Sequence, residues 1–134
     1  MRLHDWPERL SEVIAAARGT PFDYGTHDCC LFAADCIVAQ TGQDIAAAWR
    51  GQYVTLEAGL KLAKVRSLPQ LAARFFEEIH PVYAHRGDVC VAPIGELHRG
   101  RRALVMLVFD GAVLRGAAGM QVERRHATRA WRVE

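Results

Sequence analysis

An almost wholly apolar segment, residues 29 to 39, constrains the fold of this chain more than any other part. Asp35 is its only charged residue, and apolar side chains would cover nearly every face of a helix built from it. A helix that is hydrophobic all round is buried. We therefore predict a central helix from Asp28 to Thr41, ended by Gly42, with other elements packed around it.

The rest of the chain divides into helical patterns first and alternating patterns afterwards. We expect helices from Asp5 to about Gly19, over residues 46–49, from Thr55 onward and from Ser67 to about Ile79. After residue 86 the period changes to two, which predicts strands over 88–92, 103–109, 112–115, 120–123 and 130–133. This order predicts one α+β domain over residues 1–134. Its N-terminal helices, with the buried central helix among them, should pack on a small C-terminal antiparallel β-sheet, arranged as a meander.

Four cysteines, Cys29, Cys30, Cys36 and Cys90, are spread over the central helix and the first expected strand. Disulfide frameworks belong to small secreted domains, so we expect free thiols. Adjacent cysteines lack the usual spacing of a zinc site, and a site from the helix cysteines and a histidine is disfavoured. Cys30, Cys36 and Cys90 are best explained as core residues. We therefore expect no metal and no cofactor.

Charge is unevenly placed along the chain. Residues 1–85 carry eight Lys or Arg and ten Asp or Glu, whereas residues 86–134 carry nine Arg and five acidic residues. The basic half lacks the interleaved aromatic residues of single-strand binders, so nucleic acid is an unlikely partner. No run approaches the length of a membrane span, and the N-terminus has no signal-peptide core, so synthesis in the cytoplasm is expected.

The segment from Phe22 to Cys29 carries the strongest chemical signal. An aromatic loop with Tyr24 and Gly25 leads into Asp28 and then Cys29 at the start of the central helix. Free N–H groups and the dipole at a helix N-terminus stabilise a thiolate, which makes Cys29 a candidate nucleophile. Two simpler interpretations stay open: Cys29 as a small buried residue, and Asp28 as the helix cap rather than a catalytic acid.

This arrangement resembles the NlpC-type cell-wall cysteine peptidases, a branch of the papain-like fold. The matching positions are Phe22, Tyr24-Gly25, Asp28-Cys29, Gly87-Asp88 and the Asp110-Gly111 turn. Thr41-Gly42, the Arg50 to Tyr53 segment and the ending around Trp131 are similar to short members encoded among phage and prophage tail genes. The resemblance implies Cys29 as nucleophile and a cleft lined by Phe22, Tyr24, Gly25 and Asp28.

The same resemblance leaves the general base unassigned. The family histidine opens the strand that leads to the Asp110-Gly111 turn, and that place falls at Ala103, which cannot take a proton. His98, five residues upstream, and His27, next to Asp28, are the candidate bases. His126 is a weaker candidate. A working base must come within hydrogen-bond distance of the thiol.

Two functions of different classes follow from the resemblance. The first is a structural or assembly component of a phage or prophage tail, at its tip, with a degenerate peptidase site and other tail proteins as partners. Such a protein would be made in the bacterial cytoplasm and then join the virion. The second is an active cysteine endopeptidase or amidase that cleaves peptidoglycan peptides during infection. A third interpretation is a module that binds a peptidoglycan peptide without cutting it.

Overall fold

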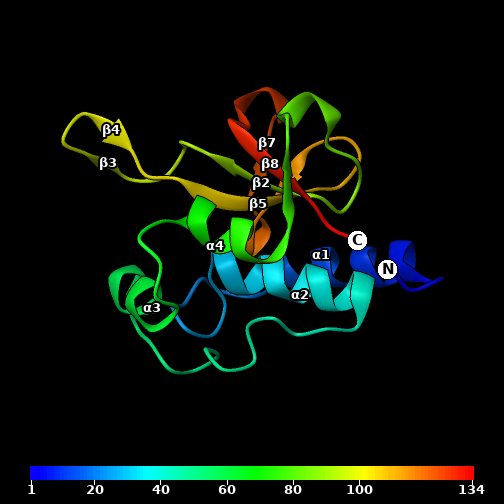
Figure 1. Cartoon of the computed structure of the whole chain (residues 1–134), viewed down its shortest axis with the longest axis horizontal. Helices are drawn as coiled ribbons and strands as arrows, with labels where there is room; N and C mark the ends of the chain where they lie inside the picture. The colour runs from blue at the N-terminus through cyan, green and yellow to red at the C-terminus, as the bar shows by residue number, and fades with distance from the viewer.

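The computed structural model describes all 134 residues, and its helices lie on one side of an antiparallel sheet (Figure 1). The predicted α+β class is confirmed. The helices are α1 Trp6–Ala17, α2 Cys29–Thr41, α3 Leu56–Leu62 and α4 Leu68–Phe75. The strands are β1 Glu77–Ile79, β2 Val89–Ala92, β3 Leu97–His98, β4 Arg101–Arg102, β5 Val105–Phe109, β6 Leu114–Arg115, β7 Gln121–Val122 and β8 Arg129–Arg132. Three short 3₁₀ turns cover Pro81–Tyr83, Ala117–Gly119 and Arg124–His126.

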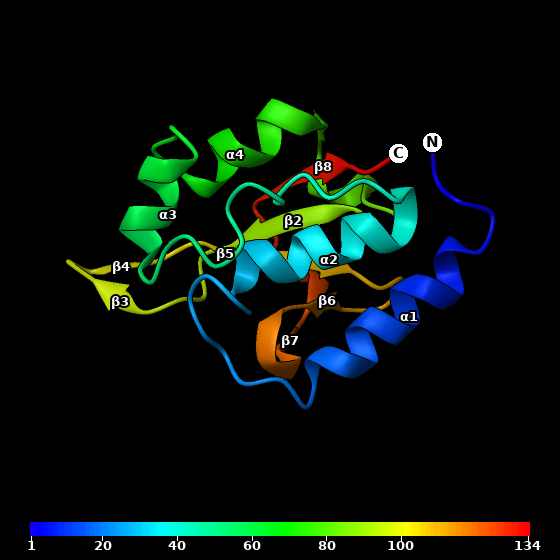
Figure 2. The same cartoon turned by 90° about the horizontal axis from the view of Figure 1, so that it is seen from below.

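The predicted central helix is confirmed as α2. It is capped by Asp28 and ends before Gly42, whose φ of 79° is the left-handed conformation that favours glycine. Figure 2 shows α2 lying across the sheet, with α1 on one side of it and α4 on the other, and its side chains pack against β2 and β5. Although α2 is almost wholly apolar, neither it nor any other helix combines the length and apolarity that crossing a membrane requires.

The sheet is more complex than the predicted meander. Its strand order is β1-β8-β2-β5-β6-β7, with every pair antiparallel. The part β2-β5-β6-β7 is a meander, but the last strand, β8, inserts between β1 and β2. That insertion buries Trp131 completely, and Trp131 pairs with Glu78 on one side and Val89 on the other. The burial of this large aromatic side chain favours a central position for β8.

Three local predictions differ from the structure. The Asp5 side chain makes no capping hydrogen bond, although α1 begins one residue later. Residues 46–49 form turns rather than a helix, with the Asp44 carboxylate accepting from the Ala46 N–H. The helix from Ser67 ends at Phe75, and residues 77–79 form β1 because β8 offers them a strand to pair with.

Two apolar layers cover the two faces of the sheet. The larger joins α1, α2 and α4 to the face that includes Val89, Val91, Met106 and Val108. The smaller covers the opposite face, and its members are Ala84, Cys90, Ala92, Leu107, Phe109, Leu114 and Ala130. Cys36 and Cys90 are buried and all four thiols are free, as expected from the sequence.

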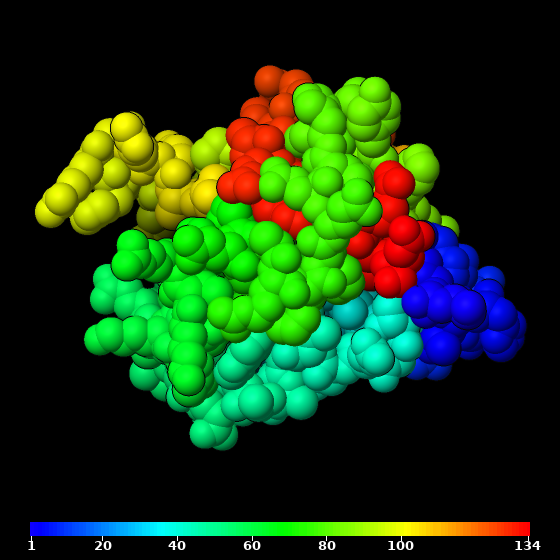
Figure 3. Space-filling model, in the orientation of Figure 1, coloured from blue at the N-terminus to red at the C-terminus, as the bar shows by residue number.

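The β3–β4 hairpin stands apart from these layers. Its strands pair only with each other, and residues 96–103 are all exposed. Arg99 and Gly100 at its tip both have positive φ, at 50° and 77°, as a tight two-residue hairpin turn requires. The hairpin projects from the body of the molecule as a separate arm (Figure 3).

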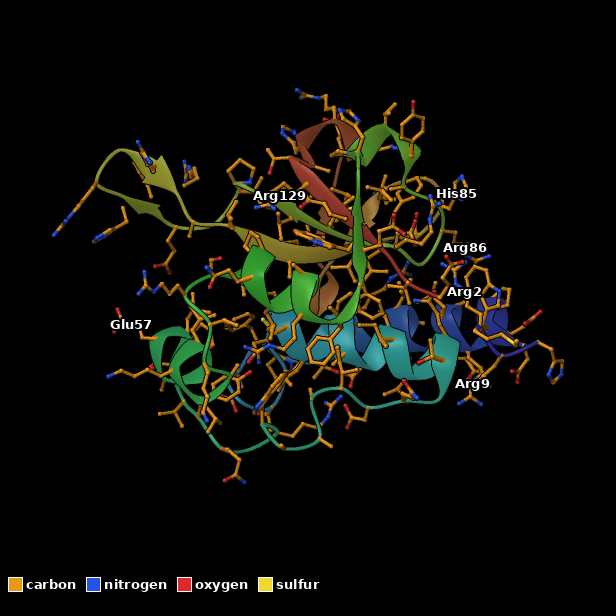
Figure 4. The ribbon with its side chains drawn as sticks, in the orientation of Figure 1. Arg2, Arg9, Glu57, His85, Arg86 and Arg129 are labelled. Carbon is orange, nitrogen blue, oxygen red and sulfur yellow. The ribbon has the colours of Figure 1, made fainter.

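A buried polar network joins the two ends of the chain, which lie side by side (Figures 1 and 2). The Asp88 carboxylate is fully buried and accepts hydrogen bonds from the N–H groups of Val133, at 3.0 Å, and His85, at 2.8 Å. Arg2 reaches the same carboxylate at 3.3 Å. Figure 4 shows Arg2, His85 and Arg86 gathered at this end of the molecule.

We expect Asp88→Asn to destabilise the fold strongly. The amide would turn an N–H donor toward donors that now face an oxygen, and unpairing a buried charged group costs about 2–4 kcal/mol. The free energy of unfolding in urea measures the effect. The exposed Glu123→Gln is the control and should change it by less than about 0.5 kcal/mol. Equal stability of the two variants would contradict the structural role of Asp88.

Candidate functional site

The carboxylate of Asp28 organises the candidate site. It accepts from the Leu31 N–H at 2.9 Å, which caps α2, and from the Gly25 N–H at 3.0 Å. The Tyr53 hydroxyl donates to the same carboxylate oxygen as Gly25. Asp28 is only 2% exposed, so these donors replace the water that its charge has lost. Its interpretation as the helix cap is confirmed.

Gly25 permits a close approach of two loops. Its φ is +87°, and a β-carbon there would lie 2.0 Å from the carbonyl oxygen of Tyr53. Its own carbonyl accepts from the Gly51 N–H at 2.7 Å. The Tyr24-Gly25 loop and the Arg50 to Tyr53 segment therefore form one unit around Asp28.

Cys29 occupies the first residue of α2, where the predicted nucleophile was placed. The pKa of its thiol lies below the ordinary value because it accepts a hydrogen bond from the Cys30 thiol and further ones from the Met106 and Cys30 backbones, while burial opposes this. The same thiol–thiol hydrogen bond, together with burial, raises the pKa of Cys30 well above its ordinary value. Of the two adjacent thiols, Cys29 is the one that ionises first.

A narrow cavity of about 60 Å³ lies beside the two thiols. Its walls come from α2, α4 and the sheet, and its roof from α3 and the segment before it. Twenty of its 22 lining residues are hydrophobic. The lining residues with ionisable side chains are Asp28, Cys29, Cys30, Tyr24 and Tyr53. Burial is the largest cause that raises the pKa of both phenols, so they remain protonated at neutral pH.

None of the six histidines lines this cavity. His27 lies in a different groove, between α1 and α2, where its Nε2 accepts from the Ala118 N–H at 2.9 Å. That hydrogen bond occupies the nitrogen a base would use. His98 is exposed on the projecting β3–β4 hairpin, and His126 lies in the 3₁₀ turn near β8. The structure therefore brings neither candidate base to the cavity that Cys29 lines.

Ala103, the position at which the resemblance would place a histidine, lies outside the strand that it was expected to open. Ala103 lies at the base of the hairpin, exposed, and bonds through its backbone to Gly95 and Glu96. The strand β5 begins only at Val105, and Met106 is its residue that lines the cavity. An apolar side chain therefore lies at the strand wall beside the thiol.

Phe22 and Tyr24, the predicted cleft-lining aromatics, pack edge to face with ring centroids 4.9 Å apart. Tyr24 lines the cavity, whereas Phe22 is 48% exposed and lies outside it. Gly25 is buried behind them. The structure contains no group of three or more His, Cys, Asp or Glu that could hold a metal ion.

Sequence reasoning missed the roles of Tyr53 and Met106. Tyr53 was part of a similarity pattern, but its contact with Asp28 joins residues 25 positions apart. The available signal was a lone tyrosine beside Gly51 in a polar stretch, which does not specify a partner.

Comparison with known proteins places the chain in a family without assigning a role. The model of a domain of unknown function, DUF6950, matches residues 1–133. The chain belongs to this family. No curated protein and no solved structure matches it.

We expect alkylation of Cys29 to reach half its maximal rate at a lower pH than an unperturbed cysteine does, since the thiolate is the reacting form and its pKa is lowered. Cys90 should stay unreactive in the folded protein, because burial raises its pKa to about 12. Peptide mass spectrometry at a series of pH values separates the cysteines. His27→Ala and His98→Ala should leave the Cys29 midpoint unchanged; an upward shift in either variant would identify a histidine partner.

We expect Tyr53→Phe to increase the alkylation rate of Cys29. Loss of the hydroxyl removes one donor from a buried carboxylate, which costs about 1–3 kcal/mol, and loosens the segment that roofs the cavity. Alkylation kinetics and thermal unfolding are measured together. Tyr83→Phe, an exposed tyrosine on the far side of the sheet, is the control. An unchanged rate in Tyr53→Phe would show that this hydrogen bond does not hold the roof.

Proposed function

We propose that this chain is a structural or assembly component of a phage or prophage tail, built on an NlpC-like scaffold whose peptidase site is degenerate. The observation that carries the proposal is the cavity beside Cys29. Its ionisable groups are two thiols, two protonated phenols and a carboxylate already engaged by three donors. A cysteine peptidase uses a base beside the thiol that later protonates the leaving amine, and no histidine lines the cavity to do so.

The tail assignment rests on the resemblance, described above, of the Tyr24-Gly25, Asp28-Cys29 and Arg50 to Tyr53 segments to short tail-encoded members of the NlpC-type family. These segments pack together around Asp28, so the similarity follows a spatial unit rather than scattered residues.

The projecting hairpin is the surface we assign to assembly. Arg99, Arg101 and Arg102 are exposed, and none forms an ion pair within the chain. Leu97 shares a face with Arg102 and is 62% exposed. Arginine beside an exposed apolar residue is a composition that favours a protein interface, and its charge favours an acidic partner.

One observation favours the alternative, an active cysteine endopeptidase or amidase acting on peptidoglycan peptides. Cys29 has a lowered pKa at the N-terminus of a buried helix, as a nucleophile requires. The apolar cavity offers no free polar group for a charged stem peptide, which disfavours both this alternative and a peptide-binding module.

The two functions separate in a phage or lysogen that carries this gene. Cys29→Ala should leave the yield of infectious particles unchanged, because the thiol has no role in assembly. Reversal of Arg99, Arg101 and Arg102 to Glu should lower the yield by about tenfold or more, since like charges then face the acidic partner. Particle counts and plaque titres provide the measurement.

Reversal of Lys61, Lys64 and Arg66, three exposed cations near α3, is the matched control and should assemble normally. Melting temperatures of the purified variants exclude misfolding as a cause. Cleavage of muropeptides by the wild type but not by Cys29→Ala would replace the structural proposal with the enzymatic one.

A further inference from the structure

The cavity beside Cys29 combines apolar walls with a nucleophile, and neither tail assembly nor a degenerate site accounts for that combination. We propose that this cavity binds a short, uncharged aliphatic acyl chain, which Cys29 holds as a thioester. The inference goes beyond the proposed function, because it concerns what the thiol can do without a histidine.

The lining defines the chemical class of the ligand. Of the 22 lining residues 20 are hydrophobic, and they include Ile37, Leu60, Leu71 and Phe75. The one carboxylate, Asp28, already accepts three hydrogen bonds. A charged or hydrogen-bonding ligand would therefore lose water without gaining a partner, whereas an alkyl chain would lose nothing.

The volume sets the length of the chain. An apolar cavity of about 150 Å³ accommodates benzene, a ligand of six carbons. The cavity here is about 60 Å³, which in proportion fits roughly two or three carbons. Acetyl and propionyl groups are of this size.

The roof offers a route of entry. No residue of α3 is fully buried, and the helix lies over the cavity through Leu56, Gly59 and Leu60. Gly59 packs against the Tyr53 ring, where an added β-carbon would lie 3.0 Å from the ring carbons. The Tyr53 hydroxyl also donates a hydrogen bond to Asp28, which attaches the roof to the residue that precedes Cys29. A chain longer than the cavity must displace α3.

Thioester exchange suits a thiolate that has no base. The Cys29 thiolate attacks the carbonyl carbon of an acyl thioester, and a new carbon–sulfur bond forms to Cys29. The carbon–sulfur bond to the donor then breaks, and the donor leaves as a thiolate that takes a proton from water. Attacking and leaving groups are both thiolates, so no residue has to protonate an amine, and no oxidant or reductant is needed.

The test uses the intact purified protein and neutral acyl thioesters of N-acetylcysteamine carrying acetyl, propionyl or octanoyl groups. A succinyl thioester, which carries a negative charge, is the matched ligand control. Peptide mass spectrometry locates the acyl group, and each rate is divided by the rate with free N-acetylcysteine. We expect propionyl transfer to Cys29 to exceed succinyl and octanoyl transfer by about tenfold or more, since a charge or a long chain is excluded.

Variants separate the cavity from the thiol. Cys29→Ser should abolish acylation, and Cys30→Ala should retain it at Cys29 at a reduced rate, because the hydrogen bond that lowers the Cys29 pKa is lost. Leu60→Trp should fill the cavity and slow propionyl transfer; if it fails to fold, the chain-length series on the wild type decides alone. A rise in melting temperature on propionylation but not on succinylation is also expected. Equal relative rates for all four thioesters, no transfer, or equal labelling of Cys30 would overturn the proposal.

Discussion

The buried carboxylate of Asp28 is the interaction on which the candidate site depends. A carboxylate that is 2% exposed must find hydrogen-bond donors, and it finds them in the first turn of α2, in the Gly25 loop and in Tyr53. These donors come from three segments that are otherwise joined only through loops. Because one carboxylate accepts hydrogen bonds from all three segments, it fixes the helix start, the aromatic loop and the roof of the cavity relative to one another. Cys29 follows Asp28 directly, so the hydrogen bonds of Asp28 also fix the position of Cys29.

A second buried carboxylate, that of Asp88, has a comparable role at the opposite end of α2. The neighbouring Gln40 amide is also fully buried; it donates to the Gly87 carbonyl at 2.9 Å and accepts from Arg2 at 2.9 Å. Gly87 has φ of +96°, and a β-carbon there would lie 2.1 Å from the Gln40 oxygen. Asp88 then binds the last residues of the chain. The Gly-Asp pair that resembles the peptidase family therefore has a structural explanation here, independent of catalysis.

The parts of the fold that local chemistry controls could be predicted from the sequence. Asp28, Thr55 and Ser67 each cap the helix that was expected to follow them, and Gly42 ends α2. The insertion of β8 between β1 and β2 could not be predicted, because strand order depends on contacts between residues 38 to 55 positions apart. Residues 77–79 carry an apolar residue at helical spacing, yet pairing with β8 outweighs that local preference.

The candidate site also has parts that local chemistry controls and parts that depend on distant contacts. The helix start placed Cys29 correctly, since capping and the helix dipole act within a few residues. The histidines are different, because a base is defined by distance in space, and the sequence neighbour His27 does not line the cavity that Cys29 lines. Its nitrogen accepts from Ala118, a residue 91 positions away whose φ of 57° is itself unusual for alanine. His27 is therefore close to Cys29 in the sequence, yet the two side chains line separate grooves of the molecule.

A cysteine without an imidazole is restricted in its chemistry rather than inert. Hydrogen bonds from Cys30 and the Met106 backbone lower the pKa of Cys29, so the attacking thiolate forms more readily than in an ordinary cysteine. What the cavity lacks is an imidazole to protonate the leaving group, since its phenols are weakened as acids by their raised pKa values and its carboxylate is occupied. An amine cannot leave without such a donor, whereas a thiolate can. With no histidine lining the cavity, the chemistry open to Cys29 is set by the leaving group.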